Sequence, residues 1–244
     1  MKDVSITRSD TGTSTLLTIR KANRFNRWMF ETIKPYLKGK LLEIGSGLGN
    51  ISRFALEDGY LITLSDLNLE YCEELRREFK GFPNLDAVMP IDLAHPDFKN
   101  VYRELKDKFD TVFLLNVIEH IEKDQTAISN CHWLLRKDGR LIVLAPAYNF
   151  LYCRFDRELG HYRRYSKKTF QQLFQPDLFT ISDTLFFNFA AIFGWLLYGK
   201  ILGNREIGKT EMGTFDKLTP LFKLADRLLM KLAGISVIAI ATKR

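Results

Sequence analysis

The sequence of 244 residues predicts an α/β fold built on a mostly parallel, doubly wound sheet. Short apolar segments alternate with segments whose apolar residues recur at helical spacing, and this alternation requires a mostly parallel sheet. The first apolar segment ends in a turn with three glycines, and the next two end in an aspartate. Sheets of this class bind nucleotides at the carboxyl ends of their strands, so the polar residues there are candidates for a binding site.

The chain before the first strand divides into two parts. Residues 1–20 are polar and rich in Thr and Ser, so we expect a weakly ordered lead or an added edge element. We see no apolar segment of the kind that a signal peptide requires there. Residues 21–38 are expected to form a helix, because apolar residues recur at helical spacing, namely Phe25, Trp28, Met29, Ile33 and Leu37.

The first strand, at residues 41–44, contains Glu43 and runs into the glycine-rich turn 45–49. Glycine adopts positive φ and lets a ligand approach the backbone closely. The spacing is not that of a dinucleotide fingerprint, because the third glycine of that motif would fall on Asn50. A glycine-rich turn that binds no ligand is the alternative, since short motifs also occur by chance.

Two further strands are expected to end in acidic residues. Residues 60–65 lead to Asp66, and residues 87–91 lead to Asp92. An acid at the end of the second strand, about 20 residues beyond a glycine-rich turn, is placed to accept hydrogen bonds from both ribose hydroxyls.

The fourth strand is expected at 109–115, where it leads into Asn116 and then His120. The turn signal Asp138-Gly139 opens a fifth strand at 140–145. Helices are predicted between the strands, at about 50–58, 68–80, 97–106 and 122–136. Asn68 is the expected N-cap of the second of these helices, and Gly81 its stop.

Two motifs resemble those of a known family. The pattern E-x-G-x-G-x-G at residues 43–49 resembles motif I of class I S-adenosylmethionine-dependent methyltransferases, and residues 116–121 resemble motif IV of the quinone-biosynthesis methyltransferases. The resemblance covers about residues 22–145. It implies a Rossmann-like, seven-stranded sheet with an antiparallel last strand, S-adenosylmethionine as cofactor, and direct transfer of its methyl group.

The resemblance also implies roles for individual residues. Glu43 would orient the methionyl ammonium group, and the glycines would leave room for methionine and ribose. Asp66 would hold the ribose, Asp92 the adenine, and Asn116 would lie beside the transfer path. The full set of implied cofactor-binding residues is Glu43, Gly45, Ser46, Gly47, Gly49, Asp66, Leu67, Asp92, Leu93 and Asn116.

A long loop at 146–165 follows the fifth strand and should leave the sheet at the edge where ligands bind. It ends in D-x-E-L-G-H-Y-R-R-Y, a string that resembles a bacterial subset of these methyltransferases, often found beside envelope-glycan glycosyltransferases. Arg163, Arg164 and Tyr165 are candidates for binding an anionic acceptor. Alternatively, the arginines pair with Asp156 and Glu158 and brace the loop. Ser166 is expected to cap a short helix that follows.

His120 and His161 are the candidate catalytic residues. His120 follows the fourth strand, where a methyl acceptor would lie, and could accept a proton near neutral pH. It could equally cap a helix or orient the loop. No cluster of His and Cys has the spacing of a metal site, so we expect no metal.

Residues 188–234 form an insertion between a sixth strand at 178–187 and a last strand at 236–241. The segment 186–198 is strongly apolar but shorter than a membrane span, which needs about 20 residues. The segment 215–232 has an amphipathic helical pattern. The insertion is expected to be a helical cap over the substrate site, and the alternative is an apolar face for a membrane or lipid.

Composition sets the remaining limits. The hydrophobic content of 46% and the charged content of 27% are those of a globular protein. The net charge of +7 comes from dispersed residues, so nucleic-acid binding is not favoured. The three cysteines, Cys72, Cys131 and Cys153, have no disulfide spacing, which indicates a reducing cytoplasm. Peripheral contact with a membrane is also compatible with the charge.

We therefore expect a single domain at 1–244, with a lead and helix at 1–38, a core at 39–187, the cap at 188–234 and the last strand at 235–244. Its expected function is methyl transfer from S-adenosylmethionine to a small-molecule or lipid- or glycan-linked acceptor, which is anionic. An RNA methyltransferase and a non-catalytic protein that binds S-adenosylmethionine are the alternatives.

Overall fold

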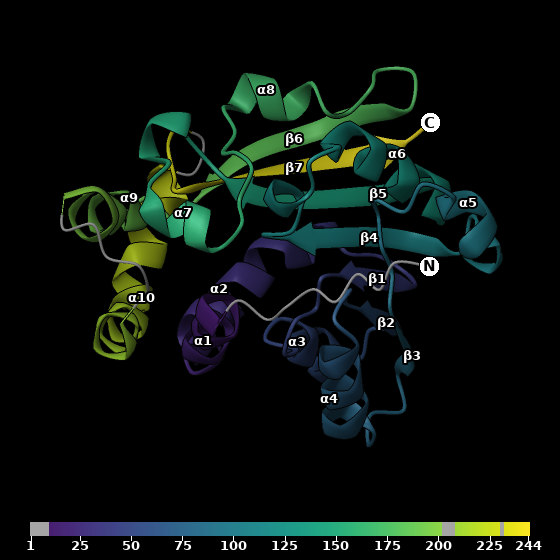
Figure 1. Ribbon diagram of the computed structural model, residues 1–244, viewed down its shortest axis with the longest axis horizontal. Coiled ribbons are helices and arrows are strands. Elements are labelled where there is room, and N and C mark those ends of the chain that lie inside the picture. Colours follow the sequence, from purple (N-terminus) through teal and green to yellow (C-terminus); the bar gives the residue numbers. More distant parts are fainter. Residues whose placement is uncertain (1–9, 202–207, 230–231) are drawn as a thin grey trace.

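The computed structural model describes residues 10–201, 208–229 and 232–244. Seven strands form one sheet in the order β3-β2-β1-β4-β5-β7-β6 (Figure 1). Neighbouring strands are parallel except that β7 runs antiparallel to both β5 and β6. The strands are β1 (Leu41–Ile44), β2 (Ile62–Ser65), β3 (Leu85–Met89), β4 (Phe109–Leu115), β5 (Leu135–Pro146), β6 (Phe179–Phe187) and β7 (Ser236–Lys243). The predicted sheet with an antiparallel last strand is confirmed.

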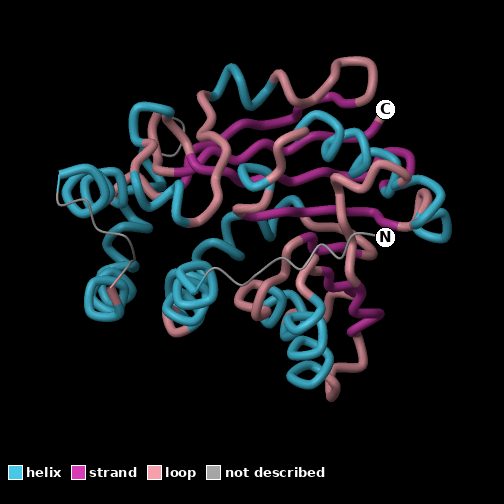
Figure 2. The backbone as a smooth tube through the Cα atoms, in the orientation of Figure 1, coloured by secondary structure: helices cyan, strands magenta, loops and turns pink. Residues whose placement is uncertain are grey.

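The helices cover both faces of this sheet (Figure 2). The α-helices are α1 (Asp10–Arg20), α2 (Asn23–Ile33), α3 (Ser52–Glu57), α4 (Leu69–Phe79), α5 (Phe98–Val101), α6 (Asp124–Leu134), α7 (Arg154–Glu158), α8 (Lys167–Gln171), α9 (Ala191–Gly194) and α10 (Lys209–Leu229). Short 3-10 helices are η1 (Lys34–Tyr36), η2 (Arg103–Leu105), η3 (Ile118–His120) and η4 (Asn149–Leu151), and η5 (Trp195–Ile201) is a π-helix.

Each face of the sheet has its own apolar core. On one face, Trp28 of α2 and Phe79 of α4 pack with strand residues such as Phe113. On the other face, Ile128 of α6 and Phe170 of α8 pack with strand residues of the opposite orientation. Strands buried on both faces need continuous apolar runs, which explains why the central strands could be located from the sequence.

The chain reverses its direction across the sheet between β1 and β4, and the connections after these two strands meet. A Cβ atom added to Gly45, after β1, would lie 2.4 Å from Val117 Cγ2, after β4. Open α/β sheets bind ligands at such a switch point, beyond the carboxyl ends of the strands.

The described part of the N-terminal lead, from residue 10 onward, is a helix and neither a weakly ordered segment nor an edge strand. Arg20 in the last turn of α1 pairs with Glu74 of α4 at 2.8 Å and also with Glu78. Thr13 and Tyr71 join the same two helices through a 2.9 Å hydrogen bond between their hydroxyl groups. The polar sequence of α1 has no clear helical pattern. The helix could not be predicted from it, because tertiary contacts supply much of its stabilisation. Residues 1–9 of the expected lead lie outside the described residues.

The segment 146–165 is also more ordered than the predicted loop, since it contains η4 and α7. Tyr162 N donates to Glu119 O at 2.8 Å, so the end of this segment folds back onto the chain that follows β4. Ser166 caps α8 as expected, and its side chain accepts a hydrogen bond from Thr169 N.

The insertion between β6 and β7 is helical, as expected, and α10 packs against α2. Figure 1 shows α7, α9 and α10 gathered beyond the end of the sheet at which β4 terminates. Asp226 of α10 accepts hydrogen bonds from the backbone of Asn188 and Phe189, at 2.9 and 2.7 Å, which fixes α10 to the end of β6. No helix in the described part of the chain is long and apolar enough to cross a membrane.

Candidate functional site

A cavity of about 1020 Å³ lies at the switch point of the sheet. Its floor is formed by the turns after β1, β2 and β4 and by the segment after β3. Helices α1, α2, α7, α9 and α10, with η5, provide its walls. Of the predicted cofactor-binding residues, the cavity is lined by Glu43, Gly45, Ser46, Gly47, Asp66, Leu67, Asp92, Leu93 and Asn116.

The turn after β1 requires glycine at every second position. Gly45, Gly47 and Gly49 have φ values of 70°, 54° and 77°, where side chains other than glycine are strained. Gly49 does not line the cavity; a Cβ atom there would lie 2.4 Å from the Phe79 ring. The third glycine therefore allows close packing of α4, whereas Gly45 and Gly47 shape the cavity.

Glu43 is a carboxylate buried without a basic partner among the described side chains. Burial raises the pKa of Glu43 to about 7, and hydrogen bonds from Ser52 and Ser46 only partly oppose this effect. A buried carboxylate of this kind attracts a cationic ligand, because an opposite charge would offset the cost of its desolvation.

Asp66 joins the ends of the first two strands. Its Oδ2 atom accepts from Gly47 N at 2.8 Å, and its Oδ1 atom accepts from Asn68 N at 2.9 Å. Burial raises the pKa of Asp66, although these backbone hydrogen bonds oppose the shift. Each carboxylate oxygen can accept more than one hydrogen bond, so Asp66 retains capacity for two ligand hydroxyls.

Two residues at the next strand ends complete this part of the cavity. Asp92 Oδ1 accepts from Ala94 N at 2.8 Å, and Leu93 is buried beside it. Asn116, after β4, has a φ of 55°, and its N–H donates to Leu144 O at 2.9 Å. Left-handed backbone of this kind is concentrated at functional sites.

The opposite part of the cavity contains Glu119, His120 and His161. Glu119 is completely buried, and neither of its carboxylate oxygens has a hydrogen-bond partner within the described structure. Burial raises the pKa of Glu119 to about 8; its own backbone N–H, which does not reach hydrogen-bond geometry, and the charge of Arg164 oppose this only partly. Burial, together with the charge of His161, lowers the pKa of His120 to about 4. The two candidate catalytic residues, His120 and His161, thus lie close to each other and to Glu119.

The candidate arginines are both paired within the protein. Arg164 is buried, donates to Asp156 Oδ1 at 2.8 Å, and lies under the Trp195 ring, 4.4 Å from its centroid. Arg163 pairs with Asp124 at 2.7 Å and does not line the cavity. These contacts favour the alternative in which the arginines brace the loop, with Asp124 as one partner instead of Glu158.

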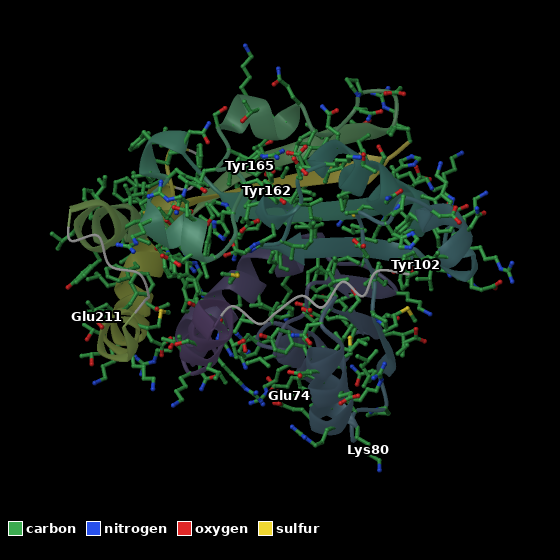
Figure 3. The ribbon with its side chains drawn as sticks, viewed as in Figure 1. Glu74, Lys80, Tyr102, Tyr162, Tyr165 and Glu211 are labelled. Atoms are coloured by element: carbon green, nitrogen blue, oxygen red, sulfur yellow. The ribbon has the colours of Figure 1, made fainter. Side chains whose placement is uncertain are left out.

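Tyr165 also lies away from the cavity lining. Its hydroxyl donates to Asp124 Oδ2 at 3.0 Å, and burial, with the nearby charge of Asp124, raises its pKa. Figure 3 shows Tyr165 well apart from Glu211, which lines the cavity from α10. The structure thus brings Arg164 to the cavity but neither Arg163 nor Tyr165.

Several lining residues were not predicted from the sequence. Leu16 of α1, Trp195 of η5 and Phe215 of α10 close the cavity, and Arg157 of α7 lines it with no ion pair to any described side chain. The cap was expected to cover the site as a whole, but the sequence did not show which of its residues would reach the cavity. Glu119 directly precedes His120, so its position in the motif was the one available signal.

Comparisons with known proteins agree with this geometry. Residues 42–141 match a family described as a methyltransferase domain. A stretch of 160 residues is 25% identical to "Probable polyketide synthase 27" of Dictyostelium discoideum, covering 57% of this chain and 6% of that protein. The chain thus spans a small part of this curated relative.

Solved structures share the fold at low sequence identity. The YcgJ protein from Bacillus subtilis superposes with a TM-score of 0.55 at 17% identity, covering 90% of this chain and 97% of its own. A TehB-like SAM-dependent methyltransferase from Corynebacterium glutamicum gives a TM-score of 0.54 at 16% identity, covering 89% and 88% of the two chains. At this level of sequence identity, the similarity shows a shared fold and nothing about substrates.

Proposed function

We propose that this chain, which carries an S-adenosylmethionine-dependent methyltransferase domain with the class I fold, methylates an anionic, partly apolar acceptor held under its helical cap. The single observation that carries the proposal is the large cavity, which extends from the glycine-rich turn to an apolar wall formed by α9, η5 and α10. The acceptor is a small molecule or a lipid- or glycan-linked one.

The residues of the glycine-rich end fit S-adenosylmethionine. Glu43 is a buried carboxylate without a described cationic partner, and the cofactor carries an ammonium group. The carboxylate of Asp66 suits the two ribose hydroxyls, and Asp92 with Leu93 suits the adenine. When bound, the cofactor supplies an activated methyl group; the protein positions it and excludes water.

The cavity is large enough for a second molecule. Ligand pockets usually enclose about 300–1,000 Å³, so a volume of about 1020 Å³ is at the upper end of that range. The cavity is also lined by apolar residues of the cap, namely Trp195, Met212, Phe215 and Phe222, and by Phe187 at the end of β6. An acceptor with an apolar portion is therefore favoured.

Arg157 is our candidate for recognising an anion on the acceptor. It lines the cavity from α7 and, unlike Arg163 and Arg164, makes no ion pair with a described side chain. The guanidinium group binds phosphate and carboxylate in a bidentate manner. The net charge of +7 also favours an anionic molecule.

The cap supports the lipid-linked form of the proposal as well. Several large apolar side chains on α9, η5 and α10 are exposed, namely Phe193, Leu197, Leu218, Leu221, Leu224 and Leu228. Amphipathic helices with such a face bind membrane interfaces. Phe215 and Phe222 of α10 face the cavity instead, so the helix can act both as a cap and as a membrane contact.

Two finer assignments rest on the same evidence. We infer that the insertion belongs to one domain with the sheet, since α10 packs on α2 and Asp226 is bonded to the end of β6. We also infer membership of the bacterial subset with the D-x-E-L-G-H-Y-R-R-Y string, because that string builds one wall of the cavity through His161 and Arg164.

The proposal is tested by an acceptor screen with radiolabelled S-adenosylmethionine, using small anions, lipid extract and RNA. We expect label in the small-molecule or lipid fraction. For the acceptor found, Arg157→Gln should raise KM about tenfold, as for the loss of a charge-assisted hydrogen bond, and leave cofactor affinity unchanged. Arg154→Gln is the matched control, because Arg154 belongs to the same helix but does not line the cavity; it pairs with Glu158 at 3.4 Å. Label in RNA alone would contradict the proposal.

A further inference from the structure

The most unusual group in the cavity is the carboxylate of Glu119. Its side chain is fully buried, and both oxygens are without a hydrogen-bond partner among the residues described. An unpartnered buried polar group costs about 1–3 kcal/mol, and more when it is charged. Such a group in a native structure requires an explanation, and an ion that belongs at the site is one.

Two histidines face this carboxylate. Ligand atoms of Glu119, His120 and His161 all lie within 4.8 Å of one another. The Nε2 atom of His161 is 4.0 Å from Glu119 Oε1, which is too long for a hydrogen bond. The two imidazole rings are nearly perpendicular, with centroids 4.6 Å apart. The three side chains thus converge without bonding to one another.

His161 is oriented by a second carboxylate. Its Nδ1 atom lies 3.0 Å from Asp156 Oδ1, which also accepts from Arg164 Nε at 2.8 Å. Because the carboxylate that pairs with Arg164 accepts the hydrogen bond from His161, Nδ1 carries the proton, and the Nε2 atom, 4.0 Å from Glu119 Oε1, is left to bind an ion.

We propose that Glu119, His120 and His161 bind one divalent transition-metal ion in the acceptor part of the cavity. Two imidazoles and one carboxylate form a common three-residue ligand set for such ions, and they leave coordination positions open for a substrate. The bond from Asp156 to His161 is the carboxylate–histidine contact that orients metal ligands in known sites.

The arrangement needs little adjustment to hold an ion. Ligand distances of about 2.0–2.2 Å place neighbouring ligand atoms roughly 3.0–3.6 Å apart, so the present separations must shorten by about an ångström. The ring of His120 lines the cavity, which allows the ion to enter. We expect rotation of the three side chains to bring their ligand atoms to one point.

An ion bound at this point would limit which acceptors the site can bind. This inference about the acceptor rests on the proposed methyltransferase function. Its open positions would take oxygen atoms of the acceptor, such as a hydroxyl beside a second hydroxyl or a carboxylate. Asn116 lies three residues before Glu119 and lines the same cavity, so a bound acceptor oxygen would lie on the side of the cofactor. His120 and His161 would then be metal ligands rather than general bases.

The test measures metal binding directly. The purified chain is treated with a chelator, its metal content is checked by mass spectrometry, and Zn²⁺ is then titrated calorimetrically, with Co²⁺ absorption as a second readout. The variants are Glu119→Gln and His161→Asn, with His132→Asn as control, since His132 contacts the Phe179 ring and does not line the cavity. Thermal melting verifies that each variant is folded.

We expect one Zn²⁺ per chain in the wild type and the control, and affinity lower by more than about 100-fold in both ligand variants. Asp156→Asn should lower affinity by about 10–100-fold, the range found for partners of metal-bound histidines. Absence of wild-type binding, or equal binding by wild type and Glu119→Gln, would overturn the proposal. Should Glu119→Gln fail to fold, the comparison of His161→Asn with the control decides.

Failure of the metal site and failure of the proposed function are distinguishable. If the wild type binds Zn²⁺ through these residues but no fraction accepts a methyl group, the site stands and the proposed acceptor class falls. If methylated product forms equally well after chelator treatment and the wild type binds no Zn²⁺, the function stands and the metal site is overturned.

Discussion

Buried acids determine the character of this cavity at the scale of single residues. Glu43 and Glu119 are both buried, and burial raises the pKa of each, to about 7 and about 8. Ionised forms of such groups destabilise the free protein. Binding of a cation would offset this free-energy cost of burial: the ammonium group of the cofactor at Glu43, and the proposed metal ion at Glu119.

The substitution Glu43→Gln should stabilise the free protein above neutral pH. Because the folded pKa of about 7 exceeds the usual 4.5, protonation favours the folded state below pH 4.5, and this contribution is lost as the pH rises through 7. The variant avoids the loss, so its advantage should grow from near zero at pH 4.5 to about 2–3 kcal/mol at pH 8. Ser52, Ser46 and Asp66, which influence Glu43, remain in place.

Urea unfolding of the two proteins at pH 4.5 and pH 8, without cofactor, measures this difference. The control is Glu57→Gln, because Glu57 forms an exposed pair with Arg27 and exposed pairs contribute little. Parallel stability profiles for wild type and Glu43→Gln would show that the carboxylate is not destabilised by burial.

The sequence predicted some of these residues and missed others for a physical reason. Glu43, Gly45 and Asp66 are found from strand ends, because each lies a fixed distance from a recognisable local pattern. The contact of His161 with Asp156 and Glu119 depends on how residues 146–165 fold back onto the chain after β4. Local sequence patterns do not show that residues 146–165 fold back onto the chain after β4.

Helix α1 is the clearest case at the scale of elements. It lines the cavity with Thr13, Thr15, Leu16 and Ile19, although its sequence predicted a weak lead. In Figure 1 it lies between α10 and the pair formed by α3 and α4. Arg20 ties it to α4. Its place over the glycine-rich turn suggests that it helps to retain the cofactor.

We predict that Arg20→Gln weakens cofactor binding about two- to fivefold with little effect on the fold. Its pairs with Glu74 and Glu78 are partly exposed, so the expected contribution is about 1 kcal/mol or less, acting on the position of α1. Isothermal titration with S-adenosylmethionine measures the change. Arg53→Gln is the control, because Arg53 also pairs with Glu78 but belongs to α3. Equal affinity in wild type and Arg20→Gln would exclude a role for this anchor.

The sequence located some strands correctly and misplaced the ends of others. The predicted fourth strand at 109–115 coincides with β4, because it is a continuous apolar run buried in the sheet. The fifth strand begins earlier than expected, at Leu135, which pairs with Phe109 before a register shift around Asp138 and Gly139. Long-range pairing of this kind extends a strand through polar residues that resemble a turn.

For the whole molecule, the shared fold supplies the cofactor end of the cavity and the cap supplies the acceptor end. The cap had two interpretations from the sequence, and α10 accommodates both. Phe215 and Phe222 face inward, whereas Leu221 and Leu228 are 62% and 81% exposed. A fold of this class hosts many functions, so we expect the cap to determine which acceptor is bound.

We predict that the double variant Leu221→Ser, Leu228→Ser binds anionic lipid vesicles less than half as well as the wild type. Burying each leucine at an interface contributes about 1.5–3 kcal/mol at most, and the loss should not affect thermal stability, since both side chains are exposed. Vesicle sedimentation measures binding, with Leu69→Ser as control, an exposed leucine on α4. Equal sedimentation of all three proteins would mean that the exposed face does not contact lipid.

Calorimetric titration of S-adenosylmethionine into the wild type and Asp66→Ala tests the central claim most directly, with Asp58→Ala as a control outside the cavity. The wild type and control should bind one equivalent, in preference to NAD. Asp66→Ala should bind more weakly by about 1.5–3 kcal/mol, the contribution of hydrogen bonds to a charged group. Unchanged affinity in Asp66→Ala, or preference for NAD, would contradict the assignment of this cavity to the methyl donor.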